Sequence, residues 1–198
     1  VLIADIAEYT KLVESDTEGT VSAWKSARKD IIDFTIRQLD GRIVKYTGDG
    51  FLAEFPTVQN AVDCAIRMQL SLKKSPLKFR MAINLGDIID DGRDIHGEGV
   101  NIAARIEALA EPGGITISGS VFEQVRNRIQ ANFEDLGEHD VKHVSAPVRV
   151  FKIASEISKN IENKKNKSAI PVMEKTKFQT NNNNRKTRLL VLPFRNSS

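Results

Sequence analysis

Short apolar runs and amphipathic segments alternate along the first 155 residues of the chain. Apolar runs with turn residues on either side are typical of β-strands, whereas apolar residues that recur every three or four positions are typical of helices. The first pattern predicts strands at 1–6, 42–46, 51–55, 77–85, 115–118, 133–136 and 148–153. The second pattern predicts helices at 9–13, 17–39, 58–72, 100–110 and 120–128. Helices and strands are therefore interleaved in this part of the chain.

A tight turn connects two of the predicted strands. Thr47-Gly48-Asp49-Gly50 separates 42–46 from 51–55, and Asp-Gly is a preferred pair in two-residue hairpin turns. Hairpin strands between helices predict an α+β fold, in which helices cover one sheet.

The charge of the chain is divided between two regions of opposite sign. The net charge is +3. Residues 156–198 hold 10 Lys and Arg against 3 Asp and Glu, a balance of +7, whereas residues 1–155 hold 19 against 23, a balance of −4. The predicted folded part therefore lacks the general basic surface that a nucleic-acid backbone requires, and we expect no nucleic-acid partner.

The C-terminal part of the sequence differs in composition from the rest. Residues 156–187 are rich in Lys and Asn and poor in large apolar residues, which predicts a linker after a domain at 1–155. The apolar run inside 188–198 predicts the start of a further domain. Because the sequence begins with Val inside an apolar run, we interpret it as a fragment whose N-terminal strand is truncated.

No segment of this fragment has the character of a membrane span or a leader. No apolar run reaches the ~18 to 20 residues that cross a bilayer, and no charged segment with a short apolar core opens the chain. The single cysteine, Cys64, has no partner for an intrachain disulfide, which suits a reducing compartment. We expect a cytoplasmic location.

Three aspartates lie beside predicted strand ends or turns. They are Asp5, Asp49 and Asp94. Mg²⁺ is usually held by one or two carboxylates together with substrate phosphates. If the hairpin lies beside the first strand, Asp5 and Asp49 converge on one such site. The alternatives are an N-cap role for Asp5, with Glu8 completing a capping box, and plain turn chemistry for Asp49.

Three further residues carry candidate chemistry. The period of two places Lys45 on the face of its strand that Ile43 shares, and the alternative to a site role is an edge-strand lysine that discourages aggregation. Asn101 and Arg105 lie four residues apart on one helix face and suit a phosphate or a developing negative charge, although a solvated face is the common explanation of such a pair. The opposite, core-facing side is predicted to hold Ile102, Ala103, Ile106 and Leu109.

These motifs, taken in order, resemble the class III nucleotidyl cyclases. The resemblance rests on Ala-Asp-Ile-Ala-Glu-Tyr-Thr at 4–10, Arg-Ile-Val-Lys-Tyr-Thr-Gly-Asp-Gly at 42–50 and Asp-Ile-His-Gly-Glu-Gly-Val-Asn-Ile-Ala-Ala-Arg at 94–105. It extends over about 1–154 and is closest to bacterial adenylate/guanylate cyclase domains. Residues 188–198 are similar to the opening of the TolB-like segment that often follows such domains. The resemblance implies a ferredoxin-like βαββαβ core with a mostly antiparallel sheet, and a downstream domain that regulates the cyclase.

The resemblance also implies a cofactor and a substrate. In the family, aspartates that match Asp5 and Asp49, with a backbone carbonyl that matches Ile6, hold two divalent cations, Mg²⁺ or Mn²⁺. Positions that match Lys45 and Asp94 recognise the base. A lysine meets the adenine N1 acceptor and a carboxylate accepts from the N6 amine, whereas guanine would leave both pairings repulsive. ATP is therefore the expected substrate.

The remaining family positions complete a shared site. Positions that match Asn101 and Arg105 orient the ribose and stabilise charge on the reacting phosphate, and Lys142 is the nearest match to a basic residue that contacts the terminal phosphates. Val141-Lys142-His143 departs from the common Lys-Gly dipeptide at that place. Family members place the metal aspartates on one protomer of a head-to-tail dimer and the base-reading and transition-state residues on the other. Because this chain has all six positions, a homodimer with two sites is expected.

The expected function is that of an adenylate cyclase, which converts ATP to 3′,5′-cyclic AMP and pyrophosphate. The alternatives are a catalytically silent module for nucleotide binding or dimerisation, and a guanylate cyclase. A cyclase that recognises guanine should have an acidic residue at position 45 and a small hydrogen-bond donor at position 94. This sequence has neither.

Overall fold

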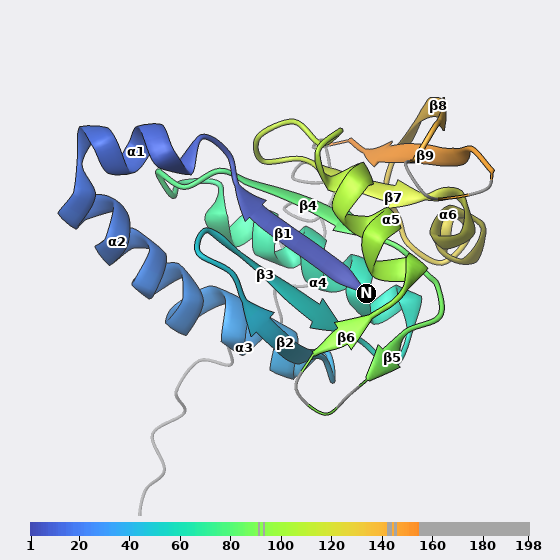
Figure 1. Cartoon of the computed structure of the whole chain (residues 1–198), viewed down its shortest axis with the longest axis horizontal. Helices are drawn as coiled ribbons and strands as arrows, with labels where there is room; N and C mark the ends of the chain where they lie inside the picture. The colour runs from blue at the N-terminus through green and yellow to red at the C-terminus, as the bar shows by residue number, and fades with distance from the viewer. Residues whose placement is uncertain (91, 93, 142–143, 145, 155–198) are drawn as a thin grey trace, which may run out of the picture.

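A seven-stranded sheet forms the centre of the molecule (Figure 1). The computed structural model describes residues 1–90, 92, 94–141, 144 and 146–154. The strand order is β2-β3-β1-β4-β7-β9-β8, and β4 with β7 is the one parallel pair among the described strands. The strands are β1 (Leu2–Ile6), β2 (Arg42–Tyr46), β3 (Gly50–Glu54), β4 (Phe79–Ile83), β7 (Ile115–Ser118), β8 (Phe133–His139) and β9 (Val148–Ile153).

The helices between these strands complete the predicted fold. They are α1 (Tyr9–Ser15), α2 (Thr17–Ser26), α3 (Asp33–Gln38), α4 (Val58–Leu72), α5 (Glu98–Glu107) and α6 (Gly119–Val125). The elements from β1 to β4 follow the βαββαβ order, and their strands lie in the ferredoxin-like order β2-β3-β1-β4. The prediction of an α+β fold with a mostly antiparallel sheet is therefore confirmed.

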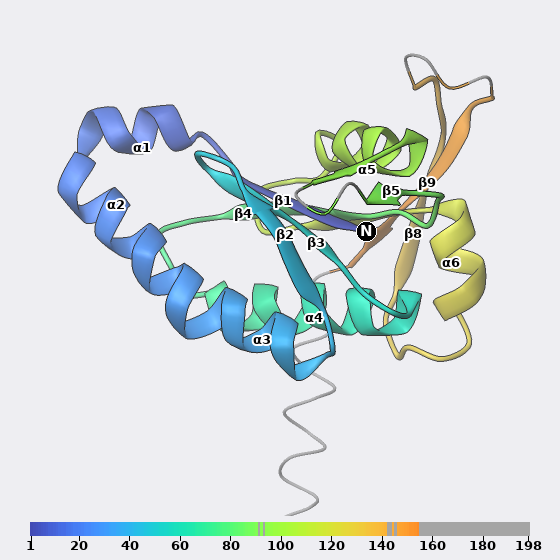
Figure 2. The same ribbon diagram turned by 60° about the horizontal axis from the view of Figure 1, so that its bottom comes forward.

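The two faces of the sheet are covered unequally. On one face, apolar side chains of β1, β3, β4 and β7 pack against α2, α3, α4 and α6 and form the main core. On the other face, α5 packs over β4, β7 and β1, where Ala82, Ile106 and Val150 form a smaller cluster (Figure 2). No described helix covers β2 and β3 on the α5 side. Lys45 and Asp5 lie on this face of the sheet, on β2 and β1.

A π-helical segment interrupts the long helix predicted at 17–39. Residues Ala27–Ile32 (η1) form this segment between α2 and α3. A π turn holds more residues than an α turn, so it sets the following helix back by about one residue position. As a result Ile32 and Ile36 are buried, whereas Phe34, which helical spacing places on the apolar face, is 56% exposed.

A small hairpin lies where the sequence indicated only a turn region. It consists of β5 (Ile89–Asp90) and β6 (Ile95–His96), which pair antiparallel. Each strand is two residues long, and such short strands have too little alternation to be detected from the sequence. The hairpin leads directly into α5.

The contact between β1 and β3 predicts a stability effect at Gly50. A Cβ atom there would lie 2.1 Å from the carbonyl oxygen of Ala4, whereas a Cβ atom at Gly48 would meet nothing within 4 Å. We expect Gly50→Ala to lower the free energy of unfolding by about 2 kcal/mol, because the two strands must move apart. Gly48→Ala should change it by less than about 0.5 kcal/mol. Urea denaturation checks this, and equal midpoints for the two variants would contradict it.

Candidate active site

Asp5 lies on the open face of the sheet. Its neighbours Ala4 and Ile6 point into the main core, so the alternation along β1 turns Asp5 to the α5 side, where its side chain is 29% exposed. The helix that follows begins after Glu8, which has a φ of 56° and no side-chain capping bond. The alternative interpretation of Asp5 and Glu8 as a capping box is therefore wrong, because Asp5 belongs to the strand.

Asp49 lies next to Asp5 at the end of β1. The pairing of β1 with β3 sets Asp5 opposite Gly50, and the backbone N–H of Ile6 donates to the Asp49 carbonyl at 2.9 Å. Burial and then repulsion from the Asp49 carboxylate raise the pKa of Asp5, while the Arg80 guanidinium opposes this rise. The two carboxylates are thus close enough to repel each other.

The donors at this corner fit a hard divalent cation. The side chain of Ile6 is buried in the main core, so only its backbone is left for the site. Carboxylate and carbonyl oxygens are the ligands that Mg²⁺ and Mn²⁺ prefer, and a bound cation would relieve the repulsion between Asp5 and Asp49. The described residues contain no group of three or more His, Cys, Asp and Glu that could hold a metal. Two carboxylates suffice for Mg²⁺, which is usually held by one or two carboxylates together with substrate phosphates.

A β-bulge in β2 determines where Lys45 points. Ile43 pairs with Ala53 and Lys45 pairs with Leu52, with the register shifting between them. Because Ala53 and Leu52 are consecutive, their side chains lie on opposite faces of the sheet, and so do those of Ile43 and Lys45. The prediction that Lys45 shares the face of Ile43 is wrong, because Val44 is the extra residue of a bulge. Lys45 instead lies on the open face, which Asp5 also shares.

Lys45 and Asp94 form an ion pair across 49 positions of sequence. The Lys45 ammonium donates to one carboxylate oxygen of Asp94, and the other oxygen accepts from the backbone N–H of Ile95 at 2.8 Å. The ammonium beside Asp94 holds the pKa of that carboxyl below its usual range. A second ion pair, Arg42 to Asp90 at 2.8 Å, also joins β2 to the β5–β6 hairpin.

The next residue, Tyr46, connects the β2–β3 hairpin to η1 and α3. Its hydroxyl donates to Asp33, and the guanidinium of Arg28 lies 3.6 Å from its ring centroid. Burial and the Asp33 carboxylate raise the pKa of Tyr46 to about 12. These contacts hold the β2–β3 turn, which carries Asp49, against the helices on the core face of the sheet. The side chain of Lys45 lies on the opposite face.

Arg80 and Glu107 are site residues that the sequence analysis did not identify. Arg80 on β4 reaches Asp5 at 3.0 Å and Glu107 on α5 at 3.0 Å. A signal was present at Glu107, because it follows the buried Ala103 by four residues and precedes the buried Ala110 by three. A charged residue at a position that helical spacing buries calls for a partner.

Asn101 and Arg105 lie on the exposed side of α5. Helical spacing turns both away from the buried Ala103 and Glu107. In the part of the chain that the structure describes, neither side chain has a hydrogen bond or an ion pair, and neither is joined to Asp5 or Asp49. The prediction that the two share a face is confirmed.

One predicted core position on the same helix is different. Leu109 was expected toward the core, but it is 38% exposed. The helix ends at Glu107, so helical spacing no longer applies at Leu109, and Ala110 is buried instead.

Several predictions fall on parts of the chain beyond the described residues. Lys142, the linker at 156–187 and the start of a further domain at 188–198 lie outside them, and these interpretations stay predictions. Among the described residues, no helix combines the length and apolar character needed to cross a membrane.

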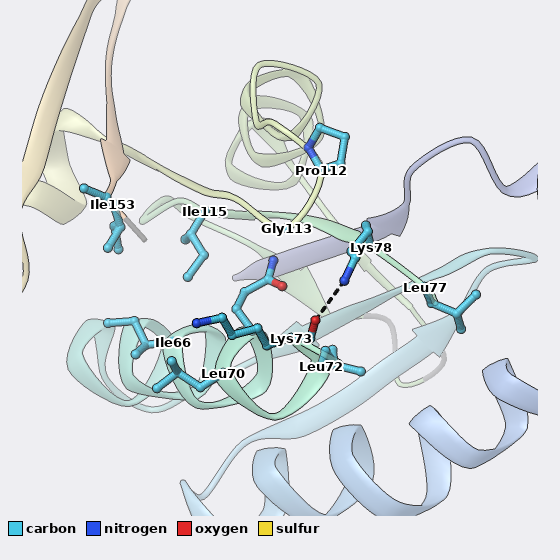
Figure 3. Close-up of a pocket in the computed structure, with 12 residues that line it drawn as sticks. Ile66, Leu70, Leu72, Lys73, Leu77, Lys78, Pro112, Gly113, Ile115 and Ile153 are labelled. Atoms are coloured by element: carbon cyan, nitrogen blue, oxygen red, sulfur yellow. Dashed lines mark hydrogen bonds between the residues drawn. The ribbon is translucent and has the colours of Figure 1, made fainter. Parts of the chain in front are cut away.

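A separate cavity of about 270 Å³ lies on the sheet face that packs against α4 (Figure 3). The end of α4 and the loop at Pro112 form its walls, and Lys78 donates to the backbone carbonyl of Lys73 at 2.9 Å beside it. Its apolar lining includes Ile115 and Ile153, which belong to the main core. The cavity therefore opens on the face opposite Asp5 and contains none of the candidate site residues.

Comparison with known proteins identifies the family. The adenylate and guanylate cyclase catalytic domain family matches residues 1–155. A Rhizobium meliloti relative is 38% identical over 159 residues, 76% of this chain and 27% of its own length. An adenylate cyclase of Glutamicibacter nicotianae is 31% identical over 126 residues, 63% of this chain and 31% of its own. The chain thus spans about a quarter to a third of these relatives.

A solved structure has the same architecture. The adenylate/guanylate cyclase/hydrolase from Silicibacter pomeroyi superposes with a TM-score of 0.72 at 39% identity, covering 77% of this chain and 94% of that one. Together with the family match over 1–155, this shows that the chain belongs to the class III adenylate and guanylate cyclase catalytic domains. This family includes both adenylate cyclases and guanylate cyclases.

Proposed function

We propose that this chain is the catalytic domain of an adenylate cyclase, which converts ATP to 3′,5′-cyclic AMP and pyrophosphate. The observation that carries the proposal is the Lys45–Asp94 ion pair on the same open sheet face as Asp5. Because this one chain carries both a base-reading pair and a candidate metal-binding pair, a head-to-tail homodimer can supply both to each site, the metal-binding pair from one copy and the base-reading pair from the other. The adenylate cyclase of Glutamicibacter nicotianae is a relative that supports this assignment.

The chemistry of the Lys45–Asp94 pair favours adenine. The ammonium is a donor and suits the N1 acceptor of adenine, while the carboxylate is an acceptor and suits the N6 amine. Guanine presents a donor at N1 and an acceptor at O6, so both contacts would be repulsive. Buried polar groups left unpaired discriminate strongly between otherwise similar ligands.

Asp5 and Asp49, with the backbone carbonyl of Ile6, are the residues that would hold two divalent cations, Mg²⁺ or Mn²⁺. Such ions, when bound, neutralise the triphosphate and lower the pKa of the ribose 3′-hydroxyl. The reaction forms a bond between the 3′-oxygen and the α-phosphorus, breaks the bond to the bridging oxygen, and releases pyrophosphate and a proton. Asn101 orients the ribose, and Arg105 stabilises the charge that develops on the α-phosphate.

We also propose that two copies of the chain build each site. Asn101 and Arg105 are exposed on the side of α5 that faces away from the sheet, so one copy does not unite them with Asp5 and Asp49. A head-to-tail homodimer brings the base-reading pair and the exposed side of α5 of one copy to the metal-binding pair of the other, and its symmetry produces two sites. Lys142 is the candidate contact for the terminal phosphates.

A product assay tests the proposal. The purified chain at high concentration, given ATP or GTP with Mg²⁺ or Mn²⁺, should produce cyclic AMP from ATP and at least ~100-fold less cyclic GMP from GTP. Chromatographic separation of the nucleotides measures both products. Preferential formation of cyclic GMP would identify a guanylate cyclase, and metal-dependent ATP binding without any product would identify a silent module.

A further inference from the structure

Arg80 lies between two carboxylates that come from different layers of the fold. Its Nη2 atom is 3.0 Å from Asp5 Oδ2, because β4 pairs with β1 and sets Arg80 opposite Asp5. Its Nε atom is 3.0 Å from Glu107 Oε1 on α5. The side chain of Glu107 is 11% exposed. One guanidinium therefore neutralises a candidate metal ligand on one side and a buried glutamate on the other.

The contact between Arg80 and Glu107 acts through charge. The Nε and Oε1 atoms are close, but they are not aligned for a hydrogen bond, and neither has another partner among the described residues. Burial, against the opposing Arg80, raises the pKa of Glu107 to about 7, and Asp5 and Asp49 add to the rise. Burying a carboxylate in such surroundings lowers the stability of the fold, so we expect Glu107 to have a role that offsets this cost.

Anchoring of α5 does not explain Glu107. The helix is already fixed by the apolar contacts of Ile106 with Ala82 and Val150. The hydroxyl of Thr116 on β7 also donates to the Ile106 carbonyl at 2.7 Å. These contacts hold α5 to the sheet one residue away from Glu107, without any ion pair.

In the proposed reaction, a cation competes with Arg80 for the Asp5 carboxylate. A divalent cation on Asp5 would repel the Arg80 guanidinium from the same carboxylate. Asp5 then holds Arg80 less strongly, and Glu107 is the acidic side chain on the other side of the guanidinium. A guanidinium retained there would keep a positive charge beside the corner where the nucleotide phosphates arrive.

We propose that Glu107 is a positioning residue, which keeps Arg80 at the site when Asp5 exchanges it for a cation. This inference rests on the proposed function, because it assumes that Asp5 binds a cation together with a nucleotide. Through Glu107, one arginine serves as the counter-ion of Asp5 before binding and as a charge facing the phosphates afterwards.

Binding of 3′-deoxy-ATP with Mn²⁺, measured by calorimetry, tests this role without turnover, because this nucleotide lacks the attacking hydroxyl. We expect Glu107→Gln to weaken binding about tenfold, as for the loss of a charged partner. In an Arg80→Gln background the same change should alter binding by less than about twofold, because a residue that acts only through Arg80 is not additive with its loss. The product assay should show the loss in KM more than in kcat.

Controls separate this role from a structural one and from a general effect of charge. Glu111→Gln removes a carboxylate whose 2.8 Å ion pair with Lys152 lies at the surface, and it should leave binding unchanged. Arg80→Lys keeps the charge but replaces the planar fork by a point charge, so it should weaken binding as Glu107→Gln does. Melting temperatures check that each variant is folded.

The outcomes are distinct. Unchanged or tighter binding by Glu107→Gln would overturn the inference, because a glutamate that merely repels phosphate gives tighter binding when it is neutralised. An effect of equal size in the Arg80→Gln background would also overturn it. If the wild-type chain binds no 3′-deoxy-ATP with Mn²⁺, the proposed function fails and the inference fails with it. Wild-type binding with no response at position 107 overturns the inference alone.

Discussion

Replacing Asp49 by alanine is expected to abolish metal-dependent cyclic AMP formation, with a fall in kcat/KM of more than about 100-fold. Changes in the residues around metal ligands already cost 10- to 100-fold, and Asp49 is one of the two carboxylates proposed to hold the cations. The product assay over a Mn²⁺ concentration series measures the loss.

The fold should survive this change. The turn is held by the Asp49 carbonyl, which accepts from Ile6 N–H at 2.9 Å, and the substitution leaves that bond in place. It also removes a repulsion that raises the pKa of Asp5, so we expect a melting temperature equal to or above that of the wild type. Asp135→Ala, at an exposed carboxylate paired with Arg149 on β8 and β9, is the matched control and should retain full activity. Metal-dependent turnover by Asp49→Ala would remove Asp49 from the metal site.

Replacing Arg105 by alanine should lower kcat by about 10² to 10³ and KM much less. That is the usual effect of losing a group that stabilises charge in the transition state. Arg105 is exposed, and its side chain has no partner in the described part of the chain, so its removal should leave stability unchanged. Steady-state kinetics with ATP separates kcat from KM, and an equal loss in both would contradict a transition-state role.

Mixing variants tests whether two copies share the site. Asp49→Ala and Arg105→Ala should each be inactive, but an equal mixture should regain about a quarter of wild-type activity, because half of the dimers are mixed and each holds one intact site. Asn101→Ala mixed with Arg105→Ala is the control. Both residues lie on one face of α5, so every site contains a defect and no activity should return. Failure of the first mixture to recover would refute the shared site.

Most of the fold follows from local patterns in the sequence. The Asp-Gly turn and the alternation on either side of it identify the β2–β3 hairpin, and the observed helix α4 (Val58–Leu72) has the bounds that helical spacing predicts. The π-helical segment was not predictable in this way, because nothing local distinguishes its residues from those of an ordinary helix. Its effect is visible only where Phe34 is exposed and Ile36 is buried.

The candidate site depended on contacts between distant parts of the chain. The aspartates and Lys45 were recognisable as chemistry-bearing residues, but which face they share depends on the strand register, and the bulge at Val44 changed that register for Lys45. The contact of Arg80 with Asp5 joins residues 75 positions apart. Pairing of β4 with β1 produces it, and no local pattern encodes that pairing.

The bulge at Val44 also separates the side chain at position 45 from the packing of the sheet. It turns Lys45 outward to a position 44% exposed, opposite Asp94 at 24%, while Ile43 and Tyr46 keep their contacts with the core. Substitutions at 45 and 94 therefore leave the packing of the sheet intact. Under the proposed function, two substitutions at these positions would change the preferred purine without disturbing the core, whereas a single-residue deletion in β2 would turn position 45 toward the core.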